Sequence, residues 1–203
     1  MNRLILTLVA MTISISNFSQ TNFLTEKVSI KQVREFENNL NSIFVGFDTT
    51  KVEKDYFPGA LEDKEYYPIK FKRTNNDFFP ELFVTYYYDE TSSDSIIICA
   101  SYDWNIMNYV RNLYDDGHYF DTEIKREKEY LQKYNEIKSD LIKKFGKPGK
   151  VEESKESNGH FYRLKWENKN LDILVLFKFS TKHKSVGKWK VGSYSIRVKF
   201  DNK

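Results

Sequence analysis

The sequence is poor in several residues and motifs that support common kinds of protein chemistry. It has a single cysteine, Cys99, so no disulfide can form within the chain. Cys99 lies in the apolar run 95–100, which predicts a buried, inert thiol. It is also far from the N-terminus, which excludes a lipoprotein, because no cysteine stands where the lipid would be attached. The folded state must therefore depend on packing.

The motifs that mark common enzyme classes are also missing. The sequence contains no G-x-S-x-G, no G-x-x-x-x-G-K-[ST], no G-x-G-x-x-G and no H-E-x-x-H. We therefore expect no cofactor and no metal site. An alternative is a secreted, hydrolytic enzyme that uses the carboxylate and imidazole groups of Asp115, Asp116 and His118. However, Asp-Gly favours a turn and Asp121 is placed to cap a helix, so a structural role is preferred.

Neither sign of charge is in large excess. The chain has 32 Lys and Arg against 29 Asp and Glu, a formal net charge of +3, and the two signs are interspersed along the sequence. Proteins that bind nucleic acids carry a basic patch or stripe. The sequence therefore predicts no nucleic-acid partner.

The one long apolar run lies at the N-terminus. Arg3 precedes the uncharged residues 4–15, and the run becomes polar at Ser16. A basic start followed by a short apolar stretch is typical of a secretory signal peptide, whereas a membrane-spanning helix needs about 20 apolar residues. We expect cleavage after Ser19 or Gln20. The alternative is an uncleaved anchor.

Cleavage would leave residues 20–203 as one exported domain, in the periplasm or the extracellular space. The composition of 40% hydrophobic and 16% aromatic residues is too apolar for a disordered chain. The longest apolar run after the signal, residues 171–177, has the length of a strand and is interrupted by Asp172. We therefore expect no membrane span in the mature chain.

Two segments show helical periodicity. Ser29 begins a capping box, and apolar residues at helical spacing predict a helix over residues 30–43. A second helix is predicted over residues 122–145, where Gly146 and then Pro148 supply the usual stop signals.

Short stretches rich in Tyr, Phe, Ile and Val, separated by polar clusters, predict antiparallel strands. Six are expected: residues 67–72, 81–88, 95–104, 160–167, 171–180 and 194–201. The fold class is therefore α+β, an antiparallel sheet with two main helices on one face in the order α-β-β-β-α-β-β-β. The alternation of residues 69–71 matches that of residues 164–166, which raises the hypothesis of a duplicated αβββ unit.

Three of the four prolines follow a pair of aromatic residues. The pairs are Tyr56 and Phe57, Tyr66 and Tyr67, and Phe78 and Phe79. A residue before proline takes an extended geometry, so the two rings of each pair should point to opposite sides of the backbone. Rings that face water would bind a sugar ring or anchor another protein. The alternative is that these aromatics complete the core.

Residues 181–192 are predicted to form a basic loop. Its candidate binding residues are Lys182, Lys184, Lys188 and Trp189, which would suit an acidic glycan or a phosphate-rich polymer. The alternative is a solubilising loop. Together these features predict a non-catalytic binding or interaction module of the cell envelope or extracellular space, with a glycan or another envelope protein as its partner.

Overall fold

The structure is a computed structural model that describes residues 22–47, 66–74, 81–89, 95–105, 127–156, 159–186 and 189–203. Of residues 89, 156, 181–186 and 189–193 it describes the backbone alone. The helices and strands are α1 (Ile30–Asn39), β1 (Ile43–Phe47), β2 (Tyr66–Arg73), β3 (Leu82–Asp89), β4 (Ile97–Asn105), α3 (Glu127–Phe145), β5 (Lys150–Glu156), β6 (Gly159–Glu167), β7 (Leu171–Val186) and β8 (Trp189–Asn202).

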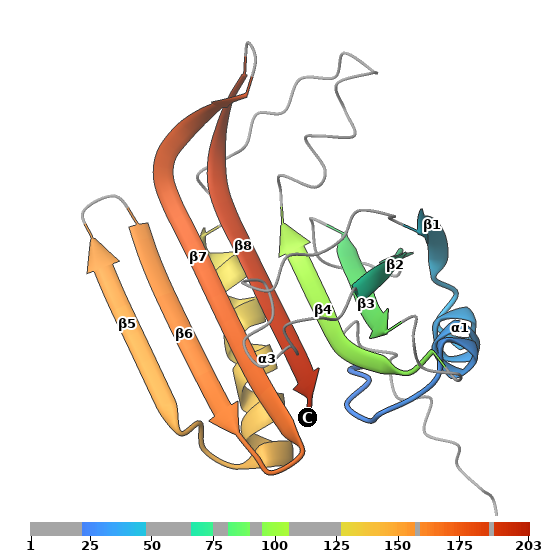
Figure 1. The fold of residues 1–203 in the computed structure, drawn as a ribbon. Coiled ribbons are helices and arrows are strands. Elements are labelled where there is room, and N and C mark those ends of the chain that lie inside the picture. The colour runs from blue at the N-terminus through green and yellow to red at the C-terminus, as the bar shows by residue number, and fades with distance from the viewer. Residues whose placement is uncertain are drawn as a thin grey trace, which may run out of the picture.

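All eight strands belong to one antiparallel sheet with the order β1-β2-β3-β4-β8-β7-β6-β5 (Figure 1). Strands β1 to β4 form one meander, strands β5 to β8 form a second, and β4 pairs with β8 where the two meet. Each meander follows one of the two described helices. The predicted α+β class with an antiparallel sheet is confirmed.

Both helices cover the same face of the sheet. A row of directly opposed, buried residues crosses that face from β2 to β6: Phe71, Val84, Tyr102, Val198, Val175 and Leu164. In β2, two residues after Phe71, Arg73 contacts Glu37 of α1. In β7, two residues after Val175, the ring of Phe177 lies 5.2 Å from that of Tyr134 of α3. Side chains alternate between faces along a strand, so α1 and α3 share one side. The main core lies between this face and the helices.

Helix α1 begins as predicted and ends four residues earlier. The Ser29 side chain accepts from the backbone N–H of Gln32, and the Gln32 side chain accepts from the backbone N–H of Ser29. Asn41 then takes a left-handed conformation with φ of 53°, which stops the helix. Ile43 follows Leu40 at helical spacing, which explains the predicted end at residue 43. It instead opens strand β1, which was not predicted.

Helix α3 ends at Phe145, as predicted, and its start is described from Glu127. Gly146 has φ of 78° and donates its N–H to the carbonyl of Ile142. The predicted residues 122–126 lie outside the described part of the chain. The residues that α3 buries against the sheet are Tyr130, Tyr134, Ile137 and Leu141, three or four positions apart.

All six predicted strands are present, and two extend several residues further. Strands β7 and β8 continue as a hairpin ladder through the pairs from His183 with Gly192 to Val186 with Trp189. The predicted loop over residues 181–192 was therefore wrong for its described residues. Lysines in this segment suggested a loop, but main-chain hydrogen bonds form a ladder without requiring apolar side chains.

In the described residues the order of elements is α-β-β-β-β in each half. It differs from the predicted order because neither β1 nor β5 was predicted. Strand β5 occupies the same position after α3 that β1 occupies after α1. Residues 69–71 lie in β2 and residues 164–166 lie in β6, the second strand of each meander. The described elements thus form two αββββ units, each with one more strand than the hypothesis supposed.

Candidate interaction surface

A buried ion pair joins α1 to the sheet. Glu37 and Arg73 are 0% and 3% exposed. Arg73 donates from Nε to Glu37 Oε2 at 3.0 Å and from Nη2 to Oε1 at 2.6 Å. The hydroxyls of Tyr86 and Ser42 also donate to this carboxylate. Four donors from the protein satisfy the buried carboxylate, so the role of this network is structural: it holds α1 against the sheet.

The same network holds the segment before α1. Arg73 donates from Nη1 to the carbonyl of Asn22 at 2.8 Å, and the Leu24 N–H donates to the Tyr102 hydroxyl at 2.6 Å. The ring of Phe23 packs 4.8 Å from that of Tyr102. Burial raises the pKa of the Tyr102 phenol above its ordinary value, so this hydroxyl stays protonated beyond the pH at which an exposed phenol ionises.

A smaller cluster lies on the opposite face of the sheet, where Cys99 packs with Tyr66 and Tyr87. Cys99 is 1% exposed, so its predicted burial is confirmed. Burial, with a further contribution from Asp201, raises the pKa of the thiol well above its ordinary value. The thiolate is the reactive form of cysteine, and it does not form here near neutral pH.

The pair Tyr66 and Tyr67 can be tested against the predicted arrangement of rings. Tyr66 packs in the Cys99 cluster, while the ring of Tyr67 lies 6.0 Å from that of Tyr88 near the core under the helices. The two rings therefore point to opposite sides, as predicted. Tyr66 is 5% exposed and Tyr67 is half-buried, so Tyr66 presents no ring to a ligand.

Most of the other predicted site residues are not described. Tyr56, Phe57, Phe78, Phe79, Lys188, Asp115, Asp116 and His118 lie outside the described residues. Lys182, Lys184 and Trp189 lie in the β7–β8 hairpin, where the backbone alone is described. Within the described ranges no group of three or more His, Cys, Asp and Glu residues is placed to hold a metal ion. No described helix is long and apolar enough to cross a membrane.

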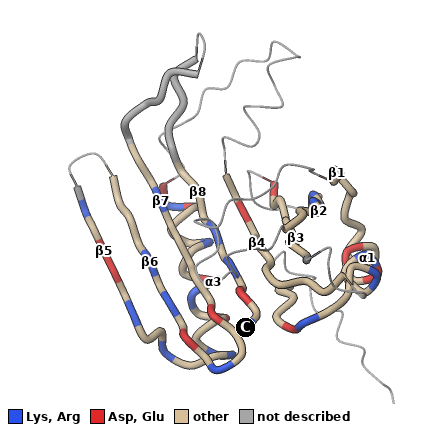
Figure 2. Tube along the Cα trace, in the orientation of Figure 1, with Lys and Arg blue, Asp and Glu red and all other residues tan. Residues whose placement is uncertain are grey.

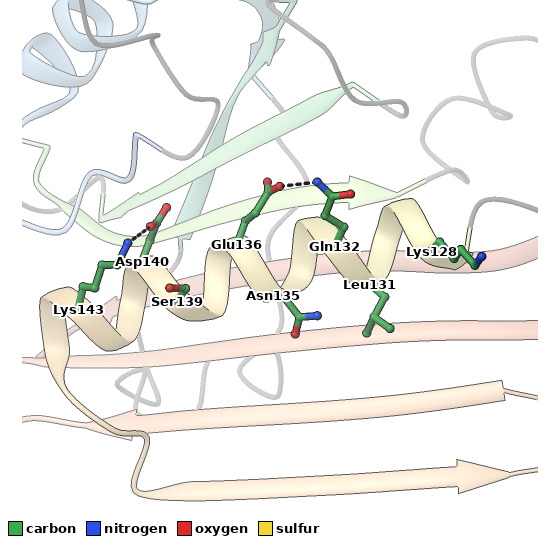
Figure 3. Close-up of a pocket in the computed structure, with 8 residues that line it drawn as sticks. All are labelled: Lys128, Leu131, Gln132, Asn135, Glu136, Ser139, Asp140 and Lys143. Carbon is green, nitrogen blue, oxygen red and sulfur yellow. Dashed lines mark hydrogen bonds and ion pairs between the residues drawn. The ribbon is translucent and has the colours of Figure 1, made fainter. Parts of the chain in front are cut away.

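A shallow hollow of about 790 Å³ runs along α3 (Figure 3). The lining residues shown come from this single helix, and most are polar. Gln132 donates to Glu136 at 3.1 Å, and Lys143 lies 3.7 Å from Asp140. Such pairs one turn apart are typical of a solvated helix face.

The edge strand β1 exposes large apolar side chains. Ile43, Phe44, Val45 and Phe47 are each about half exposed, between 49% and 52%. Their register with β2 shifts between Phe44 and Gly46, which is a bulge. Phe44 lies opposite Phe71 and Phe47 lies opposite Ile69, so the bulge brings both phenylalanines to the face that carries the helices.

The two phenylalanine rings form one aromatic surface with a cation beside it. The centroids of Phe44 and Phe47 are 5.3 Å apart, and the Arg34 guanidinium of α1 lies 5.4 Å from the Phe47 centroid. Sequence reasoning missed these rings because it assigned Ile43 to the helix. The β-rich run of residues 43–47 was the available signal.

The other edge of the sheet differs in charge (Figure 2). Strand β5 has charged residues at five of its seven positions, whereas β1 has none. Glu152 of β5 lies 2.7 Å from Lys150 and 3.1 Å from Arg163. Charged side chains on an edge strand oppose pairing with another chain. The two edge strands thus differ in charge, and β1 lacks the charged side chains that oppose pairing with another chain.

Comparisons with protein-family models, with curated proteins and with solved structures find no match to this chain.

Proposed function

We propose that this chain is an exported, non-catalytic binding module of the cell envelope or extracellular space, and that its partner is a protein that docks on the edge strand β1. One observation carries the proposal: four large apolar side chains in five consecutive residues are half exposed on a sheet edge. Apolar patches of this kind mark protein interaction sites. The expected signal peptide at residues 1–19 supports export.

Two buried groups of the described structure, the Glu37 carboxylate and the Cys99 thiol, support a binding role over catalysis. The Glu37 carboxylate is occupied by donors from the protein itself, and burial keeps the Cys99 thiol protonated. Neither group is available as a base or nucleophile. Binding requires only a surface, and β1 supplies one.

The chemistry of β1 favours a protein over a glycan. Glycan sites combine a flat aromatic ring with polar groups that bond to hydroxyls. Strand β1 instead places the aliphatic Ile43 and Val45 beside its aromatic residues. It is also an edge strand, and edge strands offer unpaired main-chain groups to a second polypeptide.

Photo-cross-linking in the producing cells tests this proposal. A photoreactive amino acid replaces Val45 on β1 or, as a matched control, Val151 on β5, which is 51% exposed. We expect a discrete protein adduct from position 45 alone. Equal adducts from both positions, or none from position 45, would exclude β1 as the docking site. An adduct with a glycan would support a binding module at β1 but would show that its partner is a glycan and not a protein.

A further inference from the structure

Resting on the proposed function, we infer that β1 binds an extended segment of its partner as an added strand, and that Arg34 recognises a carboxylate on that segment. The geometry that points to this mode is the combination of an uncharged edge strand, an aromatic pair on one face and a cation beside the pair.

Strand addition follows from the position of β1. In the described sheet β1 pairs with β2 and stands at the end of the strand order, so one of its sides is an edge. An extended segment that adds to such an edge gains main-chain hydrogen bonds, and its alternate side chains meet the two faces of the sheet.

The aromatic pair supplies contacts on one of those faces. Because of the bulge, Phe44 and Phe47 both lie on the helix-bearing face, where alternate side chains of an added strand would reach them. The Phe44 ring also lies 5.7 Å from that of the buried Phe71. Its inner side is therefore held by the core while about half of the residue stays exposed.

Arg34 gives the surface its charge preference. It is exposed on α1, and none of the carboxylates in the described structure forms an ion pair with it. By contrast, Lys72 beside Ile43 is paired with Glu81 at 2.6 Å. A guanidinium binds carboxylates through two parallel hydrogen bonds, so an acidic residue in the partner complements Arg34.

A second copy of this chain fits the surface less well. Strand β1 has five residues, none of them acidic, so pairing two β1 strands brings no β1 carboxylate to Arg34. A stable interface between proteins buries about 1,200–2,000 Å². Two short strands alone supply little of that area. An extended acidic segment of another protein is therefore the occupant that we assign.

The test uses the full exported protein to select from a displayed library of random peptides of about ten residues, enough to span a strand. We expect enrichment of peptides that alternate apolar residues with at least one Asp or Glu. Arg34→Glu should weaken a synthesised winner about tenfold or more and shift new selections toward Lys or Arg. Lys128→Glu, which reverses an exposed cation on α3, is the matched control and should change neither result.

Two further measurements separate the outcomes. Hydrogen exchange at residues 43–47 should slow when the peptide binds, and the double variant Phe44→Ser with Phe47→Ser should abolish binding.

Binding that needs the two phenylalanines but is unchanged by Arg34→Glu overturns the carboxylate preference and leaves the proposed function intact. If position 45 cross-links to a protein but no peptide is enriched, the proposal that the partner binds through an extended segment is overturned. If the unliganded protein dimerises through β1, the occupant of β1 is a second copy of this chain. Binding that ignores both phenylalanines removes the docking surface itself.

Discussion

Glu37 of α1 and Arg73 of β2 form a bidentate ion pair that is closed off from solvent on all sides. Removing one partner leaves an uncompensated buried charge, so Arg73→Met should reduce the free energy of unfolding by about 3–5 kcal/mol. Urea unfolding at neutral pH measures this loss. A reduction below about 1 kcal/mol would show that Glu37 finds solvent in the folded protein.

The coupling between these two residues can be measured with a double variant. Replacing both charges with apolar residues removes the unpaired charge, so Glu37→Leu with Arg73→Met should cost clearly less than the sum of the two single changes. The free energies of unfolding of the four proteins complete the cycle. Strict additivity would contradict the direct pairing.

Helix α3 offers a matched pair of leucines. Leu141 is 2% exposed in the core and Leu131 is 37% exposed on the outer side. Leu141→Ala should cost about 2–5 kcal/mol, because it leaves a cavity against the sheet. Leu131→Ala should cost less than about 0.5 kcal/mol. Similar losses at both positions in urea unfolding would mean that α3 does not lie on the sheet as described.

The buried thiol of Cys99 predicts loss of stability in alkali. Its pKa in the folded state is raised above the ordinary value of 9.0. Above that pH the unfolded thiol ionises while the folded one stays protonated, so the unfolded state binds fewer protons and the free energy of unfolding falls as pH rises. Burial raises the pKa of Tyr86 in the same way, which adds to the fall above pH 10.0. Urea unfolding at a series of pH values should show this, with a shallower fall for Cys99→Ala.

The reactivity of the Cys99 thiol is an independent test of its burial. A thiol-specific reagent at pH 8 should leave native Cys99 unmodified and should label it fully in urea. Rapid labelling of the native protein would place the thiol at the surface.

The export prediction concerns the mass of the mature chain. Produced in a bacterial host with a periplasm, the exported protein should begin at Gln20 or Thr21. Intact-mass measurement of that fraction decides between cleavage and retention. A mass that still includes residues 1–19 would favour the uncleaved anchor.

Much of the fold was accessible from the sequence, because the main core residues follow regular periods. Tyr134, Ile137 and Leu141 repeat at helical spacing, and the six predicted strands alternate or carry β-branched and aromatic residues. Strand β5 was missed for a physical reason. It is an edge strand with largely exposed, charged side chains, so no apolar alternation reveals it.

The candidate surface was hidden because it depends on tertiary structure. The β-rich run of residues 43–47 is a local signal for a strand, but no local pattern shows that a bulge against β2 would bring Phe44 and Phe47 to one face. Glu37 is a similar case, since a glutamate on the buried side of a helix makes sense only once Arg73 is placed opposite it. The roles of these residues depend on strand register and on burial against segments distant in the sequence, which local propensity does not encode.

The strand order also has a consequence for how the chain folds. In the described sheet every pair of neighbouring strands except β4 and β8 is adjacent in sequence. Six pairings can therefore form as local hairpins, and one must close a loop of roughly ninety residues, from Asn105 to Ser195. Strand β8 is also the last of the eight described strands to be synthesised. The edge of β4 stays open until then, so the first meander spends its synthesis with two unpaired edges and requires the C-terminal strand to close one of them.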